Sequence, residues 1–146
     1  LVANGSNTNV LDDDGNSLLY YAIKYSQEKK MDDFNNKVDF LIQNGLKADT
    51  KNNKNETLYY AAIEKDNIEI IKKIADFNID INATNKDGMT VLHIAAMKSK
   101  NSEIMKLLID LGADITSKTK FGETAFDLAS ENELLIKSNT TLNFLK

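Results

Sequence analysis

Short apolar stretches alternate with polar stretches along the chain, and their apolar positions recur at helical spacing. In 68–75 and again in 104–111, apolar residues stand three or four positions apart with charged residues between them. This spacing places the apolar side chains on one face of an α-helix. The preceding segments 58–63 and 91–97 each follow a threonine, a residue type that favours a helix N-cap. Segments 58–63 and 68–75 therefore predict one pair of short helices, and 91–97 and 104–111 predict another.

Three landmarks show that this pattern is an internal repeat. A serine or threonine precedes an apolar run at Ser17, Thr57, Thr90 and Thr124, with spacings of 40, 33 and 34 residues. A glycine or asparagine that follows an apolar run recurs at the same spacings, at Gly5, Gly45, Asn78 and Gly112. A small polar residue four positions later does so as well, at Asn9, Asp49, Asn82 and Thr116. A glycine, or at modest cost an asparagine, at a helix end favours positive φ.

All length variation falls in the helical half of the repeat. The interval from the second landmark to the first is always 12 residues and is rich in Asn, Asp, Gly and Lys, which predicts a tight turn of fixed length. The first unit carries about seven extra residues near 27–36, which we expect to lengthen the turn between its two helices.

The third unit resembles the ankyrin repeat. It contains Thr-Val-Leu-His-Ile-Ala at 90–95, against the ankyrin signature T-P-L-H-x-A, and it closes with Leu-Leu-Ile-Asp-Leu-Gly-Ala-Asp-Ile at 107–115. Segments 17–22, 57–62 and 124–129 repeat the motif in register. The resemblance implies an all-α ankyrin-repeat solenoid of stacked helix-turn-helix units joined by β-turn loops. We expect one domain, 1–146, with a partial unit at about 1–11, full units at 12–50, 51–83 and 84–117, and a C-terminal cap at 118–146.

The departures from the ankyrin signature are specific. The proline at the first helical position is replaced by Leu18, Leu58, Val91 and Ala125, and the histidine by Tyr20, Tyr60 and Asp127. His93 alone retains the motif histidine, so we interpret it as structural and hydrogen-bonded near Thr90. Small residues five positions after each cap predict close approach of neighbouring inner helices; they are Ala22, Ala62, Ala95 and Ala129. In the C-terminal cap we expect a brief second helix at 134–137, with Phe144 and Leu145 folding back over it.

Composition excludes several function classes. The chain has no cysteine, and a single histidine without cysteine cannot form a typical zinc site. Its 18 basic residues are all lysine and its net charge is −4, which argues against nucleic acid as the main partner. The acidic run 12–16 lacks the alternating spacing of a calcium loop, and no stretch approaches the ~20 apolar residues of a membrane span. We therefore expect no enzyme activity, no catalytic residue, no cofactor and no metal site.

The resemblance also implies a binding surface. In ankyrin domains the concave face is built from turn tips and exposed positions of the inner helices. By register these positions are Asp13, Asp14, Asn16, Lys24, Tyr25, Asn53, Lys54, Glu56, Glu64, Lys65, Lys86, Asp87, Met89, Met97, Lys98, Lys120, Phe121 and Glu123. The candidate anchors among them are Tyr25, Met89, Met97 and Phe121, with partial packing against the adjacent turn as the alternative.

The function implied by the resemblance is non-enzymatic binding of another protein. Two alternatives stay open. The chain lacks an initiator Met and begins within a repeat, so it can be the recognition segment of a larger protein whose activity lies elsewhere. It can also associate weakly with itself through the face of the first repeat, unless residues 1–10 cover that face.

Overall fold

The computed structural model describes residues 7–146, and in this part of the chain it contains eight α-helices and no β-strand. Two compact units divide the chain, Leu1–Ile79 and Asp80–Lys146. The N-terminal unit holds α1 (Leu18–Lys24), a 3-10 turn (Glu28–Lys30), α2 (Met31–Gln43), α3 (Leu58–Lys65), α4 (Ile68–Ile74) and a second 3-10 turn (Ala75–Phe77). The C-terminal unit holds α5 (Val91–Lys98), α6 (Glu103–Asp110), α7 (Ala125–Ser130), α8 (Glu133–Lys137) and a 3-10 turn (Asn143–Leu145). The all-helical prediction is confirmed.

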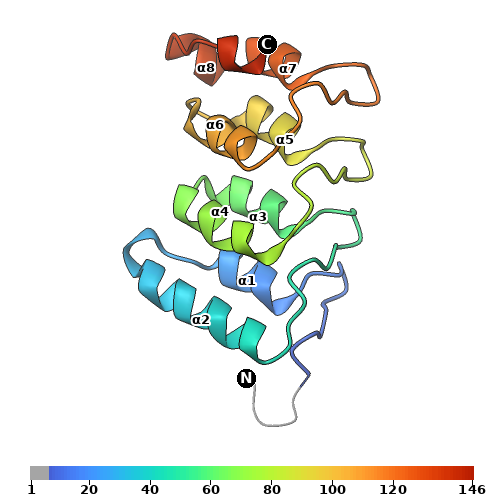
Figure 1. The fold of residues 1–146 in the computed structure, drawn as a ribbon, viewed down its shortest axis with the longest axis vertical. Coiled ribbons are helices and arrows are strands. Elements are labelled where there is room, and N and C mark those ends of the chain that lie inside the picture. Colours follow the sequence, from blue (N-terminus) through green and yellow to red (C-terminus); the bar gives the residue numbers. More distant parts are fainter. Residues whose placement is uncertain (1–6) are drawn as a thin grey trace. The chain divides into compact units, whose positions relative to one another are not determined.

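Each unit consists of two helix pairs with a common packing scheme (Figure 1). In the N-terminal unit α1 packs against α2 and α3, and α3 packs against α4. In the C-terminal unit α5 packs against α6 and α7, and α7 against α8. The predicted small residues Ala62, Ala95 and Ala129 are fully buried, as close helix approach requires. Ala22, in the first repeat, is half-buried.

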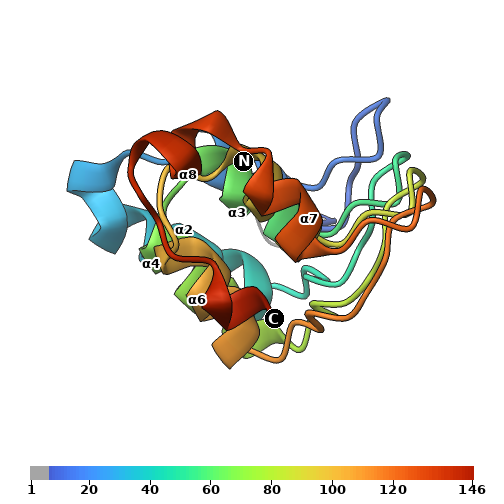
Figure 2. The same ribbon diagram turned by 90° about the horizontal axis from the view of Figure 1, so that it is seen from above.

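The turns that precede the inner helices share one hydrogen-bond pattern. The side-chain oxygen of Asn85 accepts from the backbone N–H groups of Asp87 and Met89, and the backbone N–H of Asn85 donates to the Met89 carbonyl. The residues that make the same bonds in the other turns are Asp12, Asn52 and Thr119. In each unit the two turns project from the same side of the helices (Figure 2). The predicted turn of fixed length is confirmed.

Positive backbone φ angles occur where the landmarks predict them. Gly45, Asn78 and Gly112 follow the second helices with φ of 91°, 54° and 105°. Gly88 has φ of 74°, and a Cβ atom there would lie 2.8 Å from Cγ of Lys120. Glycine is therefore favoured at 88, because φ is positive there and a Cβ atom would displace the Lys120 side chain.

Three of the four predicted caps make the expected hydrogen bond. Ser17, Thr90 and Thr124 each accept from the backbone N–H three residues later. Thr57 occupies the N-cap position of α3 with the same extended backbone, but its side chain makes no capping bond. The prediction is right about the position of this cap and wrong about its hydrogen bond.

The prediction that the extra residues near 27–36 lengthen a turn is right only in part. The connection 25–30 between α1 and α2 is longer than 66–67 between α3 and α4 and 99–102 between α5 and α6. Most of the extra residues extend α2, which has 13 residues against 7 in α4 and 8 in α6. Phe34, Val38 and Leu41 recur at helical spacing and are buried, so the added residues gain a core contact as helix. The start of α2 extends beyond the neighbouring α4 (Figure 2).

The last repeat ends in the predicted short helix. α8 spans Glu133–Lys137, Leu145 is buried, and the Phe144 ring lies 5.3 Å from the ammonium of Lys106. Gly5 and most of the predicted partial repeat lie outside the described residues, so coverage of the first repeat by residues 1–10 and an open face both stay as alternatives.

Candidate functional site

A groove of about 660 Å³ lies between the two turns and the two inner helices of the C-terminal unit. Its apolar lining consists of Met89, Met97, Phe121 and Leu128. Its polar lining consists of Asp87, Thr119, Lys120 and Glu123. The volume falls within the range of protein sites that bind a ligand or a side-chain anchor.

The turn hydrogen bonds fix the backbone at Met89 and Phe121, two of the apolar residues of the groove. The Asn85 side chain fixes the backbone of Met89, and the Thr119 hydroxyl accepts from the backbone N–H groups of Phe121 (3.2 Å) and Glu123 (3.3 Å). Phe121 is 88% exposed and Met97 46%. Packing against the adjacent turn therefore does not hide either side chain.

The charges around the groove are unequally engaged. The Lys120 ammonium donates to the Lys86 carbonyl, which ties that cation to the neighbouring turn. Glu123 accepts from the Thr119 hydroxyl at 3.2 Å. Asp87 supplies a second carboxylate to the lining. The groove thus combines an apolar floor with two carboxylates and one cation that already has an acceptor.

His93 is not part of this groove. It is buried, its Nδ1 accepts from the Thr90 backbone N–H at 3.0 Å, and its Nε2 lies 3.0 Å from the Ser117 carbonyl. Because Nδ1 is an acceptor, the proton sits on Nε2, which donates to Ser117. Burial lowers the pKa of His93 below its usual value, opposed by the bond to Ser117. The structural interpretation of this residue is confirmed.

The first inner helix, α1, and its C-cap carry a tyrosine cluster. Tyr21 stacks on Tyr25 with ring centroids 6.1 Å apart, and the Lys24 ammonium lies 5.6 Å from the Tyr25 ring. The Tyr21 hydroxyl donates to the Asp12 carboxylate, which lowers the pKa of Asp12 and raises that of Tyr21 to about 12. Tyr25 itself is 69% exposed. Only Tyr25 and Lys24 of this cluster were predicted as surface residues.

Other predicted residues of the N-terminal unit have structural roles. The Lys65 ammonium donates to the carbonyls of Lys24 (3.2 Å) and Ser26 (3.1 Å), where it covers the end of α1. Asn53 donates to the backbone carbonyls of Asp13 and Asp14 in the preceding turn. These bonds join consecutive repeats and leave the two side chains less suited to a partner.

The structure places none of the 18 predicted residues in the core. Asn16, Glu56, Lys65, Met89 and Glu123 are half-buried and the others exposed. Those brought together around the groove are Asp87, Met89, Met97, Lys120, Phe121 and Glu123. The predicted set did not include Leu128 and Thr119. Leu128 stands four residues after Thr124 in α7, a register position whose half-buried equivalents Ala61 and Ile94 point to the same helix face.

Within residues 7–146, no group of three or more His, Cys, Asp or Glu side chains is arranged to hold a metal ion. None of the helices in the same part of the chain has the length and apolar character to cross a membrane.

A family model described as "Ankyrin repeats (3 copies)" matches the chain in three overlapping places, 1–85, 31–119 and 58–145. Together these matches cover nearly all of the sequence and both compact units. No curated protein sequence matches the chain.

Proposed function

Because the chain belongs to the ankyrin repeat family, whose members are in general non-enzymatic protein–protein interaction modules, we propose that it binds a protein partner through the groove of its C-terminal unit. The observation that carries this proposal is the solvent exposure of Phe121 beside Met97, on a floor completed by Met89 and Leu128. Apolar anchors of this kind contribute most of the binding energy of protein interfaces.

The lining favours one type of partner segment. An apolar side chain of the partner fills the floor, where methionine side chains adapt to its shape at little cost. The carboxylates of Asp87 and Glu123 attract a neighbouring lysine or arginine, because they outnumber the single Lys120 ammonium in the lining. The partner segment therefore carries a large apolar residue next to a basic one.

The experiment compares the intact chain with two variants in affinity capture followed by identification of the bound protein. The test variant combines Met89→Ala, Met97→Ala and Phe121→Ala. The control variant combines Leu134→Ala and Ile136→Ala, which removes exposed apolar surface from α8 in the same unit but away from the groove. We expect one partner to be recovered by the intact chain and the control and lost from the test variant. Equal recovery by all three proteins would exclude this surface.

Selection of random displayed peptides on the intact chain tests the partner chemistry separately. We expect enriched peptides to carry an apolar residue adjacent to Lys or Arg, and to bind more weakly to the Asp87→Asn, Glu123→Gln double variant. Enrichment of acidic peptides would contradict the assigned charge preference while leaving the groove itself in place.

Self-association is a second candidate, because three apolar side chains in or just before the first full repeat are exposed. Val10, Leu11 and Phe40 are 49%, 50% and 47% exposed. Light scattering over a concentration series measures this directly, and a mass that stays at one chain at every concentration removes the hypothesis.

A further inference from the structure

Two of the four methionines of the chain line the groove of the C-terminal unit, and one of them is largely open to solvent. Met97 is 46% exposed, whereas Met89 is half-buried. Of the other two, Met105 is completely buried, and Met31 is half-buried with its sulfur 3.7 Å from Nδ2 of Asn67. Met97 is therefore the methionine that a reagent in solution reaches most easily.

Sulfur chemistry in this chain is confined to methionine. The sequence has no cysteine, so no thiol competes for a peroxide. A peroxide converts an exposed methionine to its sulfoxide, a polar side chain that methionine sulfoxide reductases return to methionine. Exposure together with the absence of thiols directs this chemistry to Met97 first.

The repeat position of Met97 is otherwise occupied by charged residues. Seven residues after their caps the other repeats have Lys24, Glu64 and Glu131, and all three are exposed. The packing of the inner helices therefore does not require an apolar side chain at this position. The apolar character of Met97 serves the groove, and a polar side chain in its place is compatible with the fold.

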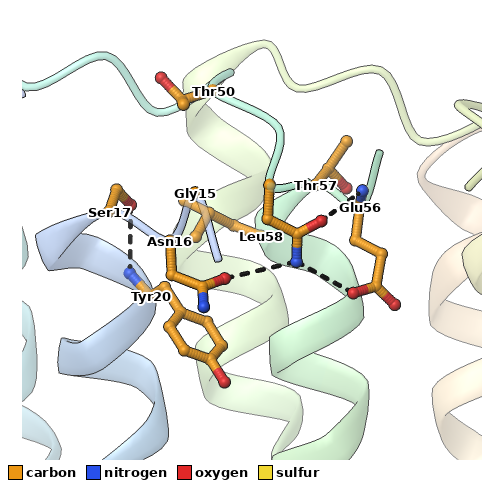
Figure 3. Close-up of a pocket in the computed structure, with 9 residues that line it drawn as sticks. Gly15, Asn16, Ser17, Tyr20, Thr50, Glu56, Thr57 and Leu58 are labelled. Atoms are coloured by element: carbon orange, nitrogen blue, oxygen red, sulfur yellow. Dashed lines mark hydrogen bonds between the residues drawn. The ribbon is translucent and has the colours of Figure 1, made fainter. Parts of the chain in front are cut away.

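The equivalent junction of the N-terminal unit is closed by polar side chains (Figure 3). Asn16 stands just before its cap, where the third repeat has Met89. The Asn52 amide donates to Oδ1 of Asn16 at 3.3 Å and to Oε1 of Glu56 at 3.0 Å, and a space of only about 20 Å³ is left. None of the described residues that line this space contains sulfur, so an oxidant finds no target there.

We propose that Met97 is a reversible oxidation site that regulates partner binding at the groove, with a peroxide as the oxidant; this inference rests on the function proposed above. The Met97 sulfur attacks one oxygen of hydrogen peroxide, so that an S–O bond forms as the O–O bond breaks. The proton of the transferred hydroxyl passes to the departing hydroxide, which leaves as water. The sulfur loses two electrons and the peroxide gains them. A methionine sulfoxide reductase reverses the change with two electrons from thiols, which become a disulfide as the oxygen leaves as water.

The sulfoxide weakens partner binding and leaves the fold intact. In the free chain its oxygen stays hydrated, because Met97 is nearly half exposed. In the complex an apolar side chain of the partner covers it, and the apolar neighbours Met89, Phe121 and Leu128 have no side-chain hydrogen-bond donor to replace the lost water. We expect affinity to fall about tenfold, since burial of one polar group without a hydrogen bond has a cost of this order.

Peptide mapping by mass spectrometry after hydrogen peroxide treatment tests the site without any partner. In the intact chain we expect Met97 to be oxidised first, Met31 and Met89 more slowly, and the buried Met105 last. Oxidation of Met31 or Met105 as fast as Met97 would overturn the proposal.

A binding measurement tests the regulation. The probe is a methionine-free synthetic peptide with an apolar residue next to lysine, and its affinity is measured by fluorescence anisotropy before and after a peroxide dose that oxidises Met97. We expect about a tenfold loss in wild type and in the control Met31→Leu, recovery after treatment with a methionine sulfoxide reductase, and no loss in Met97→Leu. Each protein is compared with its own untreated sample, so an effect of the substitution itself cancels. An equal loss in Met97→Leu, or none in wild type, would contradict the regulation.

The same samples separate this inference from the proposed function. Failure of the proposed function appears before any oxidation, as a Met89→Ala, Met97→Ala, Phe121→Ala variant that binds the peptide as tightly as wild type. Failure of the oxidation site appears only after peroxide. Thermal melts followed by circular dichroism are expected to coincide before and after treatment, and a lower melting temperature of the oxidised chain would show that the sulfoxide acts through unfolding instead of through the groove.

Discussion

Asn132 gives the sharpest test of how consecutive repeats are joined. Its Oδ1 accepts from the Leu134 backbone N–H at 2.9 Å at the start of α8. Its Nδ2 donates to the carbonyls of Ala96 and Ser99 at the end of α5, each at 2.9 Å. Both amide hydrogens and the oxygen of this buried side chain thus have partners, and the three bonds join the third and fourth repeats.

The magnitude of an Asn132→Ala substitution follows from these bonds. Loss of a helix cap costs about 1 kcal/mol. Removal of the donor to two buried carbonyls costs about 1 to 3 kcal/mol for each group left unsatisfied. We therefore expect the free energy of unfolding of the C-terminal unit to fall by about 3 to 7 kcal/mol, a large part of the 5 to 15 kcal/mol typical of a domain.

Asn101→Ala is the matched control. Asn101 accepts from the Glu103 backbone N–H at 2.9 Å in the same way, but it is exposed and lies in the same unit. We expect this variant to lose only about 1 kcal/mol. Urea unfolding followed by circular dichroism at 222 nm compares the two variants, and equal losses within about 0.5 kcal/mol would refute the inference that Asn132 joins the repeats.

Three further outcomes are expected. Burial holds the pKa of His93 below its unfolded value of about 6.5, so the contribution of His93 to stability is complete above that pH and is lost as pH falls through the lower folded pKa. Because His93 is the only histidine, the urea midpoint of wild type should drop from pH 7.5 to pH 5.5, and that of His93→Gln should change less. Parallel pH dependence in the two proteins would count against this. Ala62→Leu should overpack the seam between α1 and α3 and cost about 1 to 3 kcal/mol in a thermal melt, whereas an unchanged melt would argue against close helix approach. Spectrophotometric titration should show Tyr21 ionising at about pH 12, and this step should move toward pH 10 in Asp12→Asn, since the hydrogen bond to Asp12 is the main cause of the raised pKa of Tyr21. Burial also raises the pKa of Tyr59, but Asp12→Asn should leave that tyrosine unchanged. An Asp12→Asn curve identical to wild type would rule out the bond between Tyr21 and Asp12.

Residues whose role is local can be predicted from the sequence. The caps at Ser17, Thr90 and Thr124, the positive φ at Gly45, Asn78 and Gly112, and the structural use of His93 all depend on neighbours within a few positions. Periodicity likewise predicts the helix pairs, because an amphipathic helix needs only its own apolar face to be recognised.

Residues whose role depends on another repeat were not identified. The bonds from Asn132 to the end of α5 and from Lys65 to the end of α1 join positions more than thirty residues apart, and no local pattern specifies such a pairing. The extension of α2 was missed for a related reason: a run of Asn, Asp and Lys suggests a turn, whereas the buried Phe34 and Val38 keep it helical.

The amino-acid sequence determined the repeat, its helical class and the register of its surface positions, because these follow from spacing along one chain. Only the tertiary structure decided which surface positions line the groove beside Phe121. It also decided that Lys65 and Asn53 donate hydrogen bonds to the preceding repeat, and that the Thr57 hydroxyl has no hydrogen-bond partner. Each of these features depends on how side chains from different repeats meet in space. The spacing of residues along the chain does not specify such contacts.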